Sequence, residues 1–315
     1  KDRTCQRIHG DSGKTLTTYS MPHLKRDDVE NPEKATWEYL GVTKEFVIGS
    51  LGMGVNSGMG HGAGDRMPIE AFAVCVFDKQ SGNLLWSKVL DRFASHPAIV
   101  SDGEKLYLLD RTSERTYRGF IKSKSKDRGV SILRAFDLTD GKEVWQTSVN
   151  SERKALMVQS NTVVALPKHG DVFPNTAGVS VYNATNGEQL WEQGDRRDKG
   201  KTGRFAYRRP SFIVDGLLYI PPRVYELKTG KEVYPFTSPI SGEDQLFPMY
   251  QNFCGSVAAS KHLLLYRNAS VGMQEIKRNS GAFYLPEVRP GCEDNVIPAG
   301  GIVLAPEGAS TCTCS

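Results

Sequence analysis

Apolar and polar residues alternate around a glycine-containing turn at several places in the chain, and this pattern predicts pairs of short β-strands. The clearest copy spans residues 77–86: an aromatic residue and an aspartate precede the turn, and a tryptophan follows the glycine by four positions. Asp and Asn favour a turn start because their side chains can hydrogen-bond the backbone ahead, and glycine adopts the left-handed conformation that a short hairpin loop needs. Each copy is therefore predicted to be a strand, a tight turn and a second strand.

The pattern repeats. Four strong copies are centred on Gly82, Gly141, Gly187 and Gly230, at intervals of 43 to 59 residues, and two weaker copies surround Gly13 and Gly281. Self-similarity at a spacing of about 40 to 60 residues is typical of a repeat architecture, and the uneven intervals indicate loops of variable length on a constant frame. A large ring ends the second strand of each strong copy, and it is expected to bury apolar area against the neighbouring repeat. These rings are Trp86, Trp145, Trp191 and Tyr234.

A second pair of apolar strands precedes the hairpins. Examples are residues 98–100 with 105–109, 211–214 with 217–220, and 257–259 with 263–266. Two strands plus one hairpin make a four-stranded antiparallel blade, so the sequence predicts an all-β propeller. Six blades are visible, and six to eight are possible. The sixth is composite, because the chain starts with an outer hairpin and ends with an inner strand near residues 301–306. Pairing of the N- and C-terminal strands is expected to close the ring and remove exposed sheet edges.

The ring closure also gives an expectation for the cysteines. It would place Cys5 beside Cys312 or Cys314, and Cys254 with Cys292 forms the second expected disulfide. Metal ligation is disfavoured, because there is no Cys-x-x-Cys spacing and no histidine beyond residue 262. Disulfides indicate an oxidising compartment, periplasmic or extracellular. Cys75 lies within an apolar strand and is instead predicted to be a buried free thiol.

Length and composition exclude some classes. With 315 residues, one propeller domain spanning residues 1–315 is expected, although length alone would also allow two domains. The net charge of +4 comes from 40 basic and 36 acidic residues, which is too balanced to indicate nucleic-acid binding. No apolar run is long enough for a transmembrane helix. The chain begins without an apolar leader, as expected of a mature product or a piece of a longer protein.

The repeat Phe-Asp-x-x-x-Gly-Lys-x-x-Trp resembles that of quinoprotein-like propellers, which include alcohol dehydrogenases with pyrroloquinoline quinone (PQQ) and BamB-like outer-membrane assembly lipoproteins. The resemblance spans residues 7–286, and residues 254–314 also resemble large PQQ-like proteins of planctomycete-type bacteria. It implies the propeller fold. It does not imply the cofactor, because the PQQ dehydrogenases need adjacent cysteines, a Ca²⁺ site and a catalytic Asp, and this sequence has no adjacent cysteines. No cofactor and no metal are therefore expected.

One unusual segment is the glycine-rich stretch of residues 49–66, between an inner and an outer strand of the first full blade. As a face loop it would bring His61, Asp65 and Arg66 to a ligand. The competing interpretation is a surface insertion without a ligand, since loops both carry function and tolerate insertion.

Two further loops are rich in Lys and Arg, residues 111–128 and residues 196–209. If they share one face, they would form a basic rim suited to an anionic glycan or another anionic surface. The alternative is a solvated charge run with no partner. With the histidines near the blade edges, the remaining candidate ligand-binding residues are His96, Arg111, His169, Arg208 and Arg209.

Two hypotheses follow from these observations. The first is a non-catalytic secreted or periplasmic module that binds a protein or an anionic glycan through its loop-rich basic face. The second is an enzyme with a site in the central channel, either a lyase of anionic polysaccharides or a PQQ-type oxidoreductase. An enzyme needs ionisable groups converging in a pocket, whereas a scaffold needs an exposed apolar or charged patch.

Overall fold

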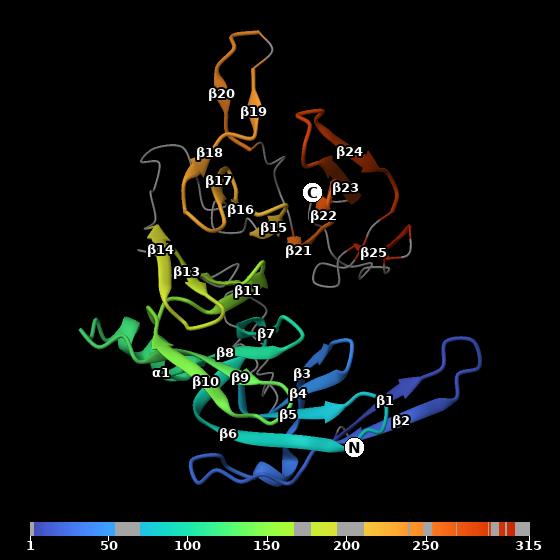
Figure 1. Ribbon diagram of the computed structural model, residues 1–315, viewed down its shortest axis with the longest axis vertical. Coiled ribbons are helices and arrows are strands. Elements are labelled where there is room, and N and C mark those ends of the chain that lie inside the picture. The colour runs from blue at the N-terminus through green and yellow to red at the C-terminus, as the bar shows by residue number, and fades with distance from the viewer. Residues whose placement is uncertain are drawn as a thin grey trace. The chain divides into compact units, whose positions relative to one another are not determined.

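A computed structural model describes residues 3–53, 70–166, 178–193, 211–238, 240–247, 254–268, 270–288, 290, 296–299 and 301–305. The described chain is almost entirely β-structure, and it forms two compact units. The first unit contains β1 to β14 with α1, and the second contains β15 to β26 (Figure 1). The predicted all-β propeller fold with four-stranded antiparallel blades is confirmed.

The first unit consists of a hairpin and three blades. The hairpin is β1 (Thr4–Ile8) with β2 (Thr15–Ser20). The blades are β3 (Thr36–Val42), β4 (Phe46–Gly52), β5 (Glu70–Asp78) and β6 (Leu84–Ser95); β7 (Ile99–Ser101), β8 (Lys105–Arg111), β9 (Ser131–Asp137) and β10 (Glu143–Ser148); and β11 (Ala155–Gln159), β12 (Thr162–Leu166), β13 (Val179–Asn183) and β14 (Gln189–Gln193). The helical elements are η1 (Pro32–Lys34), η2 (His96–Ala98) and α1 (Glu114–Lys122). The first two blades join where Phe93 pairs with Arg111.

The second unit contains two blades and two hairpins. The blades are β15 (Phe212–Val214), β16 (Leu217–Ile220), β17 (Arg223–Glu226) and β18 (Glu232–Val233), and β21 (Cys254–Ala259), β22 (Leu263–Asn268), β23 (Ser270–Glu275) and β24 (Ala282–Leu285). The hairpins are β19 (Phe236–Thr237) with β20 (Asp244–Gln245), and β25 (Ile297–Ala299) with β26 (Ile302–Leu304). The repeat pattern did not predict the β19–β20 hairpin.

The repeat turns have the predicted chemistry. All six repeat glycines have a positive φ, between 68° and 86°. In the first strong copy, Oδ1 of Asp78 accepts hydrogen bonds from the backbone N–H groups of Gln80 and Ser81, and the N–H of Gly82 donates to the carbonyl of Asp78 at 2.9 Å. The side chain that precedes the turn therefore fixes the loop, as expected from its position in the repeat.

Tryptophan rings hold consecutive blades together. The indole of Trp86 donates to the carbonyl of Leu138 at 2.8 Å and covers Gly141, where a Cβ atom would lie 2.6 Å from the ring. One blade later, the indole of Trp145 donates to the carbonyl of Ala184 at 3.0 Å. It covers Gly187, where a Cβ atom would lie 2.4 Å from the ring. The docking of one blade's ring on the next blade's turn is confirmed at both positions. At Gly141 and Gly187, glycine is therefore required for two reasons: the backbone has a positive φ, and a side chain would collide with the ring above it.

The first hairpin uses smaller groups at the equivalent joint. Thr17 stands where the strong copies have tryptophan; its hydroxyl donates to the carbonyl of Gln80 at 3.0 Å, and its methyl group covers Gly82. Tyr19 lies beside it and donates to the carbonyl of Lys79 at 2.6 Å. The weaker sequence signal of this copy therefore reflects a different side chain at the joint and not a different fold.

An ion network ties the first two blades together on their flank. The guanidinium of Arg134 in β9 contacts Asp91 at 2.8 Å, Asp110 at 2.9 Å and Glu143 at 2.6 Å. Asp110 is fully buried, and it also accepts the backbone N–H of Arg92. Burial raises the pKa of Asp110, and the bonds from Arg134 and Arg92 partly offset that rise.

The cysteines are only partly described. Cys75 in β5 is a fully buried free thiol, as predicted, and burial raises the pKa of its thiol to about 12. Cys5 is a half-buried free thiol. Its predicted partners Cys312 and Cys314 lie outside the described residues, as does Cys292, and only the backbone of Cys254 is described. The two disulfides, the ring closure and the single-domain organisation stay predictions.

The docked glycines give a stability test. Gly141→Ala is expected to destabilise the protein by roughly 3 kcal/mol, from about 1 kcal/mol for an L-residue at positive φ and a further 1–3 kcal/mol for overpacking against Trp86. Gly13→Ala is the matched control, because Gly13 has a φ of 68° but no atom within 4 Å of its added Cβ. Its cost should be about 1 kcal/mol. Denaturant midpoints measure both, and equal losses would contradict the docking argument.

Candidate functional site

One edge of the blades in the first unit gathers polar and charged side chains. Pairing of Glu70 with Ser95, of Phe93 with Arg111 and of Arg111 with Ser131 brings the start of β5 and the ends of β6 and β8 to this edge. Lys154, just before β11, reaches the same place, because the hydroxyl of Ser95 lies 3.5 Å from its carbonyl. The loops that leave this edge are therefore neighbours.

A helix occupies the edge where the sequence analysis expected a loop. Residues 114–122 form α1, and the side chain of Ser113 caps it by accepting the N–H of Thr116 at 3.2 Å. Ser at the N-cap with Glu in the first turn and Lys in the last is a typical helix pattern. The expectation of a loop across 111–128 is wrong, because Ser113 and Glu114 form a helix-start signal within the charge-rich stretch.

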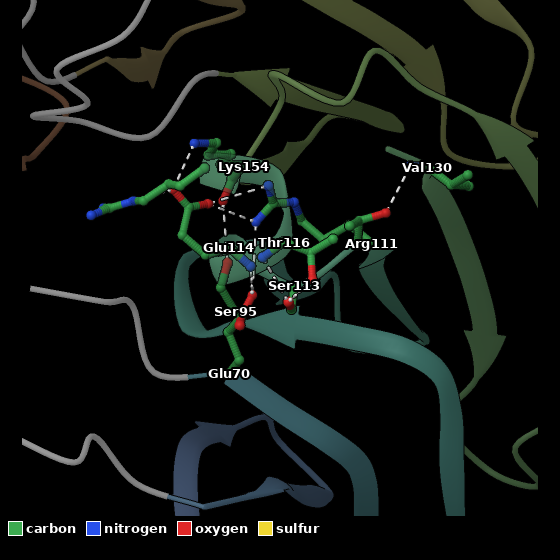
Figure 2. A network of polar contacts seen from close by, with 10 residues as sticks. Glu70, Ser95, Arg111, Ser113, Glu114, Thr116, Val130 and Lys154 are labelled. Carbon is green, nitrogen blue, oxygen red and sulfur yellow. Dashed lines mark hydrogen bonds and ion pairs between the residues drawn. The ribbon is translucent and has the colours of Figure 1, made fainter. Parts of the chain in front are cut away.

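A buried ion cluster centres on Glu114 (Figure 2). One carboxylate oxygen contacts Nε of Arg118 at 3.0 Å and Nζ of Lys154 at 3.1 Å, and the other accepts from both terminal nitrogens of Arg111, at 3.3 and 3.4 Å. The side chains of Arg111, Glu114 and Lys154 are each at least 95% buried. Three cations thus share one carboxylate, and they connect the helix to β8 and to the segment before β11.

Glu70 completes the cluster from β5. Its Oε1 accepts the backbone N–H of Glu114 at 2.8 Å, and it lies 4.0 Å from Arg111. A carboxylate at this position also interacts favourably with the positive end of the helix dipole. The ring of Tyr117 packs beneath the cations, 4.4 Å from Nζ of Lys154 and 5.7 Å from the guanidinium carbon of Arg111.

The two carboxylates have opposite pKa shifts. Burial raises the pKa of Glu70, and the N–H of Glu114 and the charge of Arg111 only partly offset it. Burial also raises the pKa of Glu114, but Lys154, Arg111 and Arg118 together outweigh it, and the pKa of that carboxyl is lowered. Glu114 is therefore the anion that neutralises the cluster, while Glu70 is the group that burial penalises.

Exposed cations follow the buried cluster along the chain. Five basic side chains of α1 and the turn after it are exposed, and the exposed acidic side chain among them is Asp127. The exposed cations are Arg115, Lys122, Lys124, Lys126 and Arg128. We call these five residues the basic surface. Its backbone is well bonded: the N–H of Ser125 donates to Phe120 at 3.0 Å, and Asp127 accepts the N–H of Gly129 at 2.7 Å.

A sequence model of the family described as outer membrane protein assembly factor BamB matches residues 34–220, more than half of the chain. The chain belongs to this family. The matched region runs from β3 to the end of β16, so it contains the docked tryptophans, α1 and the ion cluster. A comparison with curated protein sequences gives no match.

A comparison with solved structures finds several that are similar to this chain. BamB from Moraxella catarrhalis is 10% identical with a TM-score of 0.48, over 95% of this chain and 87% of that protein. The β-propeller domain of the Trilobed protease from Pyrococcus furiosus is 13% identical with a TM-score of 0.45, and the match covers 85% of this chain and 77% of that one. A quinohemoprotein alcohol dehydrogenase from Pseudomonas putida HK5 is 15% identical with a TM-score of 0.44, and the match covers 90% of this chain but 44% of that one.

Two of the predicted ligand-binding residues are described. Arg111 lies inside the ion cluster, with its terminal nitrogens on Glu114. His96 is exposed in η2, next to Ser95 at the same blade edge, with its ring edge-on to that of Tyr39 at 5.4 Å. The other candidates lie outside the described residues and stay predictions; they are His61, Asp65, Arg66, His169, Arg208 and Arg209.

Sequence reasoning missed Glu70, Glu114 and Lys154, although they form the centre of the arrangement. They are 44 and 40 residues apart in the chain, and each is an ordinary charged residue in its own segment. Within the described ranges, no group of three or more His, Cys, Asp or Glu side chains is arranged to hold a metal ion. Nor does any helix there have the length and apolar character to cross a membrane.

The opposite shifts of the two carboxylates predict opposite pH effects. A lowered pKa in the folded state means that Glu114 stabilises the fold above its ordinary pKa of 4.5, and that this stabilisation is lost as the pH falls through the lowered value. Glu114→Gln should therefore cost about 3–5 kcal/mol near pH 7, because it leaves buried cations unpaired. The difference in unfolding free energy between the native protein and this variant should become smaller below pH 4.5.

Glu70→Gln is the matched control. The pKa of Glu70 is raised in the folded protein, so ionisation of this carboxyl lowers the free energy of unfolding. The loss grows as the pH rises through the raised pKa. The variant should gain stability relative to the native protein over that range, while its amide oxygen can still accept the N–H of Glu114. Urea midpoints from pH 3 to 8 measure both variants. The same pH trend in both would show that the cluster is not organised as described.

Proposed function

We propose that the protein is a non-catalytic propeller module, secreted or periplasmic, that binds an anionic protein or glycan through the basic surface formed by α1 and the turn after it. The observation that carries this proposal is the set of five exposed cations with one exposed carboxylate among them. Such a surface raises the local concentration of anionic partners and speeds their association. Membership of the BamB family supports a location in the cell envelope.

The ion cluster supports the same proposal, because it fixes the helix that carries the charges. Glu114 is the first residue of α1 and Arg118 is one turn further on, and both are held by buried partners. A helix held in this way presents Arg115 and Lys122 with little loss of backbone freedom on binding.

The sequence has no adjacent cysteines, which the resemblance to PQQ dehydrogenases would require for the cofactor alternative. A central-channel lyase was the other enzymatic alternative, and among its described candidates the terminal guanidinium nitrogens of Arg111 are already bonded to Glu114. We therefore favour binding over catalysis.

Charge reversal tests the proposal. The triple variant Lys122→Glu/Lys124→Glu/Lys126→Glu should lose about tenfold in affinity for heparin, used as an anionic-glycan probe, or for poly-glutamate, used as an acidic-protein probe. Exposed ion pairs contribute up to about 1 kcal/mol each, and 1.4 kcal/mol is a factor of ten. Titration at two salt concentrations measures the effect, which should weaken at high salt.

The matched control is Lys14→Glu/Lys34→Glu/Lys44→Glu, which makes the same change in net charge at exposed positions elsewhere in the first unit. It should bind both probes nearly as the native protein does. If both triple variants lost the same affinity for the probes, net charge alone would explain the loss, and the basic surface would be refuted as a binding site. The preferred probe would distinguish a glycan from an acidic protein as the partner class.

A further inference from the structure

The β19–β20 hairpin interrupts the repeat. It lies between the blade of β15 to β18 and the blade of β21 to β24, and in the part of the chain that the structure describes its two strands pair only with each other. Figure 1 shows it, in orange, extending away from the β15–β18 sheet that precedes it. The connection between the first two blades takes only η2, so the repeat itself does not need such an extension.

Aromatic packing holds the base of the hairpin. Phe247, two residues after β20, is fully buried, and the centroid of its ring lies 6.0 Å from that of Phe236, 5.1 Å from that of Tyr219 and 6.0 Å from that of Phe212. The backbone N–H of Phe247 also donates to the carbonyl of Pro222 at 3.0 Å. The base is therefore part of the core of the second unit.

The hairpin is also bonded near its end and at its tip. The amide of Asn279, from the last blade of this unit, donates to Gln245 at 3.1 Å. At the turn, the hydroxyl of Ser238 accepts the N–H groups of Ile240 at 3.3 Å and Ser241 at 3.1 Å, and the N–H of Gly242 donates to the carbonyl of Ser238 at 2.9 Å.

Ile240 itself has no packing role. Its side chain is 96% exposed, far more than any other large apolar side chain in the described chain. A single exposed apolar residue is ordinary, but this one stands at the tip of a bonded hairpin with a buried base. The surrounding charge is one-sided: residues 236–247 contain Glu243 and Asp244 and no Lys or Arg, in a chain whose net charge is +4.

We propose that this hairpin is a second docking element, independent of the basic surface, that inserts Ile240 into an apolar socket on another protein, with Lys or Arg residues at the rim of the socket facing Glu243 and Asp244. A preformed protrusion loses little conformational freedom on binding, and a central apolar anchor with a charged rim is the usual anatomy of a protein interface. The same acidic residues disfavour an anionic lipid surface.

A photoreactive amino acid at position 240 tests the proposal in the full-length protein, expressed in its own host and irradiated in intact cells. The expected result is one discrete protein adduct whose crosslinked residue, mapped by mass spectrometry, lies in an apolar surface beside Lys or Arg. Most of the adduct should be lost when Glu243→Lys/Asp244→Lys is added. Position 42 is the matched control, because Val42 is also a strongly exposed β-branched residue, at the end of β3.

Three results would overturn the proposal: adduct yields at 240 no higher than at 42, adducts that are lipid or a second copy of this chain, or an adduct that survives the charge reversal. Circular dichroism and the thermal midpoint of each variant provide the folding control. Both should match the native protein, because Ile240, Glu243 and Asp244 are exposed.

Discussion

The close contact between an indole ring and a glycine turn determines how this protein is built. Trp86 and Trp145 each cover the turn of the following blade and bond a carbonyl three residues before its glycine. Because the contact fixes both the ring and the backbone beneath it, consecutive blades are held at a constant offset while the connecting loops vary in length. The loops can then acquire other roles, as α1 and the β19–β20 hairpin show.

The ion cluster has a different structural role from the contacts between tryptophan rings and glycine turns. It attaches an inserted helix to three neighbouring segments with charges, where an apolar contact would have been the ordinary choice. Buried ion pairs often contribute little net stability, because desolvation offsets the attraction. Their geometry is nevertheless specific, because the carboxylate of Glu114 contacts Arg111 with one oxygen and Lys154 with the other. The arrangement favours orientation of the exposed cations over tight packing.

The sequence predicted those parts of the fold that follow from local chemistry. The hairpins could be found because the aspartate, glycine and aromatic ring of a copy such as residues 77–86 lie within ten positions. The cluster could not, because Glu70, Glu114 and Lys154 come together only through the pairing of distant strands. The helix was missed for a local reason, since its cap at Ser113 was hidden in a charge-rich stretch. The β19–β20 hairpin was missed because its strands are two residues long.

The joint between the first hairpin and the first blade differs from the others in a way that bears on motion. There, a threonine methyl group and the hydroxyl of Tyr19 take the place of an indole. In repeat proteins stability is close to a sum of terms between neighbours, so a joint with less buried ring area has less local stability. Amide hydrogens of β1 and β2 would exchange with solvent sooner than those beneath Trp86 and Trp145. The chain would then begin to open at its amino-terminal hairpin while the tryptophan joints of the first unit stay closed.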